Sequence, residues 1–167
     1  RKRLEEEIRL DPLTRILNKK AFREEAEAFL ENTGEQETAA LYVIDIDDFK
    51  EINDTFGHEY GDFAIVSIAK AMLKHCDADA IAARTGGDEF IVLEGAKDEE
   101  SGRVLAQKIR TELSKAQRAM QLPFDLSASI GAVVAHPGEE NVLESYVKRA
   151  EMLMYEEKAE KKVSRDS

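Results

Sequence analysis

A pair of glycines, Gly86 and Gly87, separates two strand-like runs and constrains the fold more than any other feature of this sequence. The runs extend from Ala80 to Thr85 and from Asp88 to Leu93. Two glycines between such runs predict a tight hairpin, because a type I′ turn needs positive φ at both central residues. A second interpretation is functional, since a turn without side chains lets an anionic group approach the backbone N–H groups closely. In both cases the chain must contain an antiparallel pair of strands.

Hydrophobic periodicity predicts the other elements, and the 167 residues suffice for one domain. In chain order we expect a helix from Asn18 to about Leu30, a strand over Thr38–Asp45, a helix from Asp48 to Gly57, a helix over Glu59–Lys74, then, after the hairpin, a helix over Glu99–Ala119, a strand over Leu126–Val134 and a helix from Leu143 to about Lys161. Asn18 is expected to cap its helix, and Asp48 with Glu51 to form a capping box. This order predicts an α/β (α+β) layered domain with a mostly antiparallel central sheet covered by helices.

The first ten residues are expected to form the end of a helix, with Leu4 and Ile8 on one face. Asp11-Pro12 ends that helix, because a proline moves the preceding residue out of the α region. The segment is interpreted either as the tail of a linker helix that continues upstream or as a solvated helix that packs on its own domain.

Composition excludes several classes of protein. The longest uncharged apolar run, Ala39 to Ile44, is far shorter than the ~20 residues of a membrane helix, so no membrane contact is expected from this segment. A net charge of −11 argues against broad binding to a nucleic-acid backbone. Cys76 is the only cysteine, which excludes an internal disulfide and fits a reducing, cytoplasmic location. A small anionic ligand would need lysines or a metal ion to reverse the local field.

Acidic residues lie at the ends of two apolar strands. Asp45 closes the first predicted strand, and Asp88 and Glu89 open the strand after the two glycines. If these strands are neighbours, three carboxylates converge, and like charges 4 Å apart cost about 4 kcal/mol at an effective dielectric of 20. Such a cluster needs protonation, solvent or a cation, and if a cation is present, hard oxygen ligands favour Mg²⁺ or Mn²⁺. The alternative is that Asp88 and Glu89 are surface acids beside a turn, while Asp47 and Asp48 cap the next helix.

The stretch Arg84-Thr85-Gly86-Gly87-Asp88-Glu89-Phe90 resembles the signature of the GGDEF domains, the diguanylate cyclases of bacterial signalling. Four further stretches resemble other motifs of that family in the family's order: Asp11-Pro12-Leu13-Thr14 with Asn18, the segment from Asp45 to Asp62, Ser129-Ile130-Gly131, and the segment from Ala150 to Lys158. We therefore expect residues 1–10 to end an upstream linker or signalling helix, residues 11–163 to form a GGDEF domain, and residues 164–167 to form a C-terminal tail.

The resemblance implies a palm-like fold, similar to nucleotide cyclases and polymerases. It also implies a reaction in which two GTP molecules become cyclic di-GMP and two pyrophosphates. Two copies of the domain would meet face to face, each holding one GTP, under the control of an upstream sensor domain. The implied location is the cytoplasm, in some cases as the cytoplasmic part of a larger sensor protein, and no nucleic acid is implied as a partner.

The resemblance also implies roles for particular residues. Asp45, Asp88 and the backbone carbonyl of Ile46 would hold Mg²⁺ or Mn²⁺, with Glu89 in the same metal-binding and catalytic cluster. Asn53 and Asp62 resemble the pair that reads guanine, and a carboxylate is suited to accept from guanine N1–H and N2–H₂, which adenine does not offer. The triphosphate would be met by a larger set: Lys50, Lys158, Lys162, the backbone around Asp48 and Phe49, and the turn at Gly87. For the lysines the alternative is an ordinary solvated position.

Several positions depart from the family pattern, among them Arg15, Asp48, Thr85 and Glu151. The family's product-inhibition site is an Arg-x-x-Asp ahead of the signature, where this chain has Asp77 and Ala80, so this site is expected to be absent. Lys162 replaces a usual arginine and keeps the charge while losing the bidentate fork. Two rivals to an active cyclase remain: a catalytically silent GTP-binding regulatory or interaction module, and another palm-type nucleotidyl transferase, which Asn53 and Asp62 together disfavour.

Overall fold

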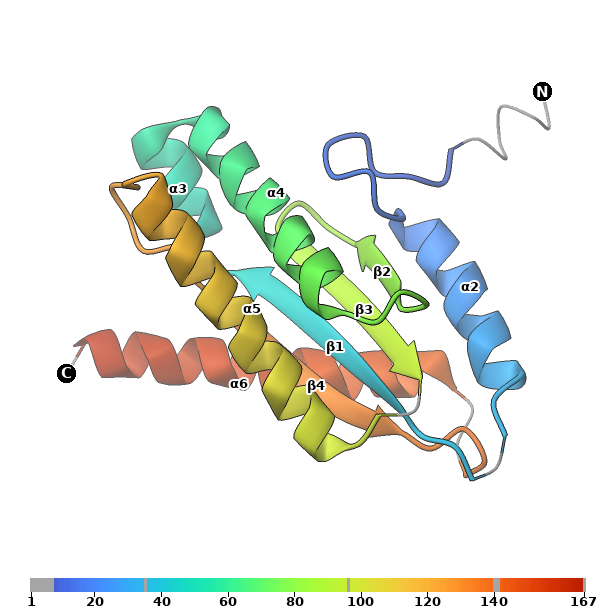
Figure 1. The fold of residues 1–167 in the computed structure, drawn as a ribbon. Helices are drawn as coiled ribbons and strands as arrows, with labels where there is room; N and C mark the ends of the chain where they lie inside the picture. The colour runs from blue at the N-terminus through green and yellow to red at the C-terminus, as the bar shows by residue number, and fades with distance from the viewer. Residues whose placement is uncertain (1–7, 35, 96, 140–141, 167) are drawn as a thin grey trace.

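A computed structural model describes residues 8–34, 36–95, 97–139 and 142–166. Helices and strands are interspersed along the chain, with α3 followed directly by α4 and β2 directly by β3 (Figure 1). In order they are α2 (Lys19–Glu31), β1 (Ala39–Ile46), α3 (Phe49–Phe56), α4 (His58–His75), β2 (Ile81–Arg84), β3 (Glu89–Gly95), α5 (Glu99–Ala119), β4 (Ala128–Ala135) and α6 (Leu143–Asp166). The predicted element order is therefore confirmed, and Asn18 caps α2 by accepting a hydrogen bond from the Ala21 N–H at 2.9 Å.

The four described strands form one sheet in the order β2-β3-β1-β4, and all three pairings are antiparallel. Every residue of β1 is buried, because helices cover both faces of the sheet. Helices α4 and α5 cross one face, where Tyr42 and Ile44 belong to the larger core cluster, while α6 crosses the other (Figure 1). Leu41 and Val43 point to the α6 side and pack with the second core cluster. The mixed, mostly antiparallel fold is thus as predicted.

A glycine sets how closely α6 crosses the sheet. A Cβ atom at Gly131 of β4 would lie 1.9 Å from the carbonyl oxygen of Ala150, so only glycine admits the backbone of α6 at this distance. This contact fixes the position of the helix at the sheet and directs its C-terminal half past the end of β1. The small-residue motif Ser129-Ile130-Gly131 therefore has a packing reason.

The connection between β2 and β3 differs from the predicted type I′ turn. The Thr85 N–H donates to the Glu89 carbonyl at 2.8 Å, so three residues rather than two form the bend. Neither Gly86 nor Gly87 adopts a left-handed φ. The physical reason lies in Arg84, whose guanidinium donates to the carbonyls of both glycines at 2.7–3.2 Å and holds the turn in this shape.

Two other predictions about helix ends were wrong. Asp48 does not form a capping box with Glu51, because its own backbone is left-handed (φ 57°) and its side chain makes no capping bond. Its carboxylate instead contacts Arg165 at 2.7 Å. Helix α6 continues to Asp166, beyond its predicted end near Lys161.

The expected helix over residues 1–10 falls largely outside the described residues. Within the described part, residues 8 and 9 lie in a turn, and Leu10 forms an isolated bridge with Leu17. None of the described helices combines the length and the apolar composition that a membrane crossing needs.

Candidate metal and nucleotide site

The end of β1 and the start of β3 bring together two acids that are far apart in the sequence. Asp45 lies opposite Glu89 in the β1–β3 register, and the Ile46 N–H donates to the Asp88 carbonyl at 3.1 Å. The two strands are neighbours, as the carboxylate hypothesis required. The prediction that Asp45 and Asp88 meet at one edge of the sheet is therefore confirmed.

The Asp45 carboxylate has an unusual environment. Its side chain is only 12% exposed, and its Oδ2 lies 3.1 Å from the Lys158 ammonium. Its Oδ1 is buried without a hydrogen-bond partner among the described residues. Burial raises the pKa of Asp45 to about 7, and the neighbouring carboxyl of Asp88 adds to the rise. Two carboxyls this close repel each other unless a proton or a cation lies between them.

The oxygen atoms at this edge form a donor set that suits a hard divalent cation. The Asp45 carboxylate, the Ile46 carbonyl oxygen and the Asp88 carboxyl are all hard ligands of the kind that Mg²⁺ and Mn²⁺ prefer. The unpartnered Asp45 Oδ1 is a buried acceptor that a cation would satisfy. The ammonium of Lys158 already lies 3.2 Å from the Ile46 carbonyl, which shows that this position attracts positive charge.

Glu89 does not join Asp45 and Asp88. Asp45 and Glu89 are register partners in β1 and β3, but among the described residues no group of three acidic, histidine or cysteine side chains is placed to hold a metal ion. A metal-binding role for Glu89 therefore stays a prediction. Glu89 contacts the Thr85 hydroxyl at 3.4 Å and faces a cavity of about 380 Å³ between α2 and α6. Burial, and then the nearby charge of Glu151, raise the pKa of Glu89. Two acids therefore meet at the edge and the third faces a different cavity.

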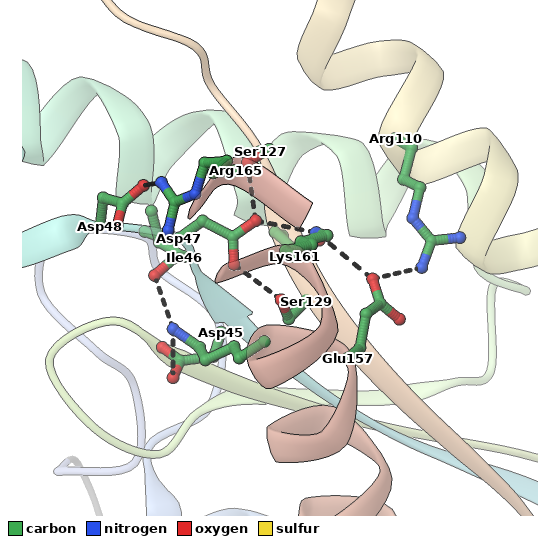
Figure 2. A network of polar contacts seen from close by, with 12 residues as sticks. Asp45, Ile46, Asp47, Asp48, Arg110, Ser127, Ser129, Glu157, Lys161 and Arg165 are labelled. Atoms are coloured by element: carbon green, nitrogen blue, oxygen red, sulfur yellow. Dashed lines mark hydrogen bonds and ion pairs between the residues drawn. The ribbon is translucent and has the colours of Figure 1, made fainter. Parts of the chain in front are cut away.

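The basic face of helix α6 packs against the acidic end of β1. Three acids, Asp45, Asp47 and Asp48, pair in order with Lys158, Lys161 and Arg165 at 3.1, 2.8 and 2.7 Å. The basic positions are spaced three and then four residues apart, which places them on one side of a helix. Figure 2 shows the labelled members of this ladder, with Lys161 and Arg165 reaching Asp47 and Asp48. We call this set the acid–base ladder.

Asp47 is the most completely bonded acid of the ladder. Its oxygens accept from the Ser127 and Ser129 hydroxyls at 2.7 Å each, and from Lys161 (Figure 2). Burial alone would raise the pKa of Asp47, but the bonds from Lys161 and the two serines outweigh it and lower the pKa. Lys161 also donates to the Ala128 carbonyl at 2.7 Å. Sequence reasoning missed Lys161 and Arg165, although their spacing from Lys158 could have indicated a shared helix face.

A cavity of about 630 Å³ opens beside the acidic edge and is lined by half of the predicted substrate residues. Its lining includes Ile46, Asp48, Phe49, Lys50, Asp88 and Lys158. A second cavity, of about 450 Å³, lies along the ladder and is lined by Lys158 and Lys162 together with Lys161 and Arg165. Lys158 lines both cavities, whereas Lys162 reaches only the second. Gly87 is exposed at the turn and lines neither of them.

The two residues predicted to read guanine lie on consecutive helices, Asn53 on α3 and Asp62 on α4. A Cβ atom at Gly61 would lie 1.9 Å from the Asn53 side-chain oxygen. Gly61 therefore leaves the space in which the Asn53 amide sits, next to the start of the Asp62 side chain. Asp62 is exposed and Asn53 is half-buried, and neither lines the cavity beside Asp88.

The turn that carries Asp88 is tied to the segment before α2. Arg84 contacts the Asp11 carboxylate at 3.1 Å, with both side chains less than one-fifth exposed. Asp11 also accepts from the Thr14 N–H and hydroxyl at 2.9 and 2.7 Å. Arg84 thus joins the first motif to the carbonyls of Gly86 and Gly87. The sequence contained both residues, but nothing in it showed that they would contact each other.

The two positions of the product-inhibition site hold no arginine. Asp77 pairs with Lys97 at 2.9 Å, and its N–H donates to the buried Glu94 carboxylate at 2.8 Å. Ala80 is half-buried at the end of the same loop. The Asp77 carboxylate is therefore already neutralised by a neighbouring residue.

Comparison with known proteins gives a consistent result. Residues 8–164 match the family described as "Diguanylate cyclase, GGDEF domain". The chain is 35% identical over 152 residues to the probable diguanylate cyclase DgcT of Escherichia coli (strain K12), covering 89% of this chain and 33% of that protein. It is 33% identical over 161 residues to the diguanylate cyclase VdcA of Vibrio cholerae, covering 93% of this chain and 46% of that one. The chain thus spans between a third and a half of these relatives.

A solved structure agrees with the fold. The GGDEF domain of DgcB from Caulobacter crescentus, in complex with c-di-GMP, superimposes with a TM-score of 0.79 at 31% identity, covering 90% of both chains. The expected fold and the resemblance stated from the motifs are both confirmed by these matches.

Proposed function

The chain belongs to the GGDEF domain family, and on that premise we propose that it is a diguanylate cyclase domain, which condenses two GTP molecules into cyclic di-GMP and two pyrophosphates. One observation carries this proposal. Asp45 and Asp88 meet at the end of the sheet, beside a cavity that is lined by Lys50 and Lys158. Without nearby lysines, the two acids would repel a triphosphate. Without the acids, the lysines would bind the triphosphate but provide no site for a cation.

Asp45, the Ile46 carbonyl and Asp88 would hold Mg²⁺ or Mn²⁺, since their oxygens match the preference of these ions and Asp45 Oδ1 lacks another partner. When bound, such an ion supplies positive charge to the phosphate oxygens as negative charge develops on them. Glu89 would act with Asp88 and Asp45 as a catalytic acid, which requires its carboxylate to turn toward them from the cavity between α2 and α6.

Recognition of the nucleotide is divided between two regions. Asn53 and Asp62 would pair with the guanine edge, and a polar pair of this kind rejects adenine because its groups would remain unpaired. Lys50, Lys158 and Lys162 would bind the β- and γ-phosphates. The backbone at Asp48 and Phe49 is suited to assist, because no side chain of Asp48 caps the first N–H groups of α3. The exposed Gly87 leaves the turn open to the nucleotide.

The reaction requires two copies of the domain. Each would hold one GTP, and the 3′-hydroxyl of one nucleotide would attack the α-phosphorus of the other. The new O3′–P bond forms as the bond to the β-phosphate oxygen breaks, and pyrophosphate leaves. The proton of the hydroxyl passes to Asp88 or Glu89, the two acids at the start of β3. Residues 11–163 would form a catalytic domain that lies in the cytoplasm, and an upstream sensor domain would control the pairing.

A direct assay tests this function. The chain is incubated with GTP and Mg²⁺, and cyclic di-GMP and pyrophosphate are quantified by mass spectrometry and a coupled assay. We expect one cyclic di-GMP for every two pyrophosphates, no product from ATP, and a specific activity that rises with protein concentration while few dimers are present. GTP binding without turnover would instead identify a silent regulatory module. A specific activity that is constant at every dilution would contradict catalysis by transient pairs.

A further inference from the structure

Lys158 lies where the proposed cation would lie. Its ammonium contacts the Asp45 Oδ2 at 3.1 Å and the Ile46 carbonyl oxygen at 3.2 Å. Both atoms are ligands of the proposed metal site. An ammonium and a divalent ion cannot share the same two oxygens at these distances, because the two positive charges repel each other. Metal binding therefore requires Lys158 to leave.

The Lys158 side chain also has space to move away from Asp45. Its side chain is 28% exposed, whereas that of Asp45 is 12% exposed. It lines both the cavity of about 630 Å³ beside Lys50 and the cavity of about 450 Å³ beside Lys162. A lysine side chain is a flexible stem that ends in a compact charge, so it can move from one anionic partner to another without moving its helix.

We propose that Lys158 takes the place of the divalent cation between Asp45 and the Ile46 carbonyl until a triphosphate offers its ammonium another anionic partner, so that metal ion and nucleotide bind this chain cooperatively. The inference rests on the proposed function for the identity of the nucleotide. It goes beyond that function by giving one lysine two positions and by ordering the binding events.

The binding of the ion is linked to the release of Lys158, because both occupy the same oxygens. An ion that binds alone must break the contacts of Lys158 with Asp45 and Ile46, so its affinity is lowered by the cost of those contacts. A nucleotide restores the loss by accepting Lys158 at its phosphates. The coupling is reciprocal, so the ion must also raise the affinity for the nucleotide. Because the Lys158 ammonium competes with the ion for the same oxygens, removing it must raise the affinity for the ion when no nucleotide is present.

The first test measures Mn²⁺ binding without nucleotide, by calorimetry on the whole chain. Lys158→Met is expected to bind Mn²⁺ about tenfold more tightly than the unmodified chain, the scale of a charged hydrogen bond. Lys148→Met is the matched control, because Lys148 is an exposed lysine of the same helix outside the ladder. Asp45→Asn should abolish the gain. Equal Mn²⁺ affinity in folded Lys158→Met and the unmodified chain would overturn the proposal.

The second test needs no variant and remains valid if Lys158→Met does not fold. Lysines of the unmodified chain are acylated briefly, and labelling is quantified by peptide mass spectrometry with and without saturating Mn²⁺. Released from Asp45, Lys158 should be labelled several-fold faster in the presence of Mn²⁺, while Lys148 is unchanged. Unchanged labelling of Lys158 would contradict the proposal. Neither test depends on turnover, so a chain that makes no cyclic di-GMP could still support this inference, and an active one could refute it.

Discussion

The two sides of the candidate site are built by different means. At the end of β1, three acids each have a basic partner from α6, and the partners come from more than one hundred residues along the chain. At the turn before β3, the backbone bends through two glycines, and one arginine holds it by its carbonyls. The first side is organised by charge and the second by backbone geometry.

This difference predicts different consequences of mutation. In the acid–base ladder, loss of Lys158 or Lys161 leaves a carboxylate that is only 12% exposed without its charged partner, so the effect should appear in stability and cation binding. In the turn, loss of Arg84 leaves Asp11 with only its hydrogen bonds from Thr14 and frees the bend that carries Asp88, so the effect should appear in the rate of the chemical step as well as in stability. The predictions below test that contrast, beginning with the largest effect.

Replacing the acid on either side should have the same large effect if both hold one ion. Asp45→Asn and Asp88→Asn should each lower turnover by about a thousandfold, the upper range for loss of one preorganised electrostatic group. The double variant should be no slower than the single ones, because they act as a unit. Steady-state cyclic di-GMP formation measures this, with Asp79→Asn, an exposed acid before β2, as the control. If the reductions in turnover multiply in the double variant, Asp45 and Asp88 act independently and do not hold one ion.

Arg84 tests the turn. Arg84→Ala should reduce kcat by about 10- to 100-fold, the range for residues that orient a metal ligand, with a smaller change in KM. Arg103→Ala serves as the control, because Arg103 is an exposed arginine of α5 that pairs only with a surface glutamate among its described ion pairs. If kcat is unchanged while KM rises strongly, Arg84 binds substrate and does not position the turn.

Lys161 tests the ladder. Lys161→Met should lower the free energy of unfolding by about 1–3 kcal/mol, because the Asp47 carboxylate, 12% exposed, loses its charged partner. Urea unfolding measures the loss, and Lys162→Met, which changes an exposed lysine, should leave it within 0.5 kcal/mol, about the usual range for surface changes. If the acid–base ladder does not stabilise the fold, Lys161→Met and Lys162→Met will unfold at the same urea concentration.

The link from Asp11 to Arg84 should depend on pH. Burial alone would raise the pKa of Asp11, but hydrogen bonds from Thr14 and the charge of Arg84 lower it overall. Because the pKa of Asp11 is lower in the folded state, its ionised carboxylate stabilises the fold at pH values above the unfolded pKa of about 4. This stabilisation is lost as the pH falls through the folded pKa. At pH 7 the free energy of unfolding of the unmodified chain should be about 1 kcal/mol higher than that of Asp11→Asn.

That difference should shrink in chemical denaturation experiments below pH 4. Glu27→Gln, which changes an exposed acid of α2, should show no comparable pH dependence. A gap between the chain and Asp11→Asn that grows toward low pH would have the wrong sign for this explanation.

The smallest expected effect concerns the product. Asp77 is neutralised by Lys97 and no arginine stands at that position, so cyclic di-GMP added to the assay should leave the initial rate unchanged. Strong non-competitive inhibition that is lost on substitution of Asp77 would contradict the absence of this site.

Much of this molecule was predictable from local sequence. The element order, the α5 bounds and the Asn18 cap follow from periodicity and capping chemistry, which are properties of neighbouring residues. The contact of Asp45 with Asp88 followed from two strand ends and one assumption of adjacency. The turn type did not, because the Arg84 side chain, and not glycine's freedom, decides its shape.

What sequence could not supply was partners across space. The left-handed backbone at Asp48 and its pairing with Arg165 depend on where α6 passes, which the contact of Gly131 with Ala150 determines. The separation of Glu89 from Asp88 likewise depends on a hydroxyl four residues earlier and on the cavity between α2 and α6. Two residues that are adjacent in the sequence, Asp88 and Glu89, therefore have side chains in different environments.

The most direct measurement is a crystal structure with Mn²⁺ and a non-hydrolysable GTP analogue, in which anomalous scattering at the manganese edge locates the ion. The account predicts a peak bounded by the Asp45 carboxylate, the Ile46 carbonyl and the Asp88 carboxyl, with the Lys158 ammonium moved onto the phosphates. A peak elsewhere, or a bound nucleotide with Lys158 still on Asp45 and no ion at this edge, would contradict it.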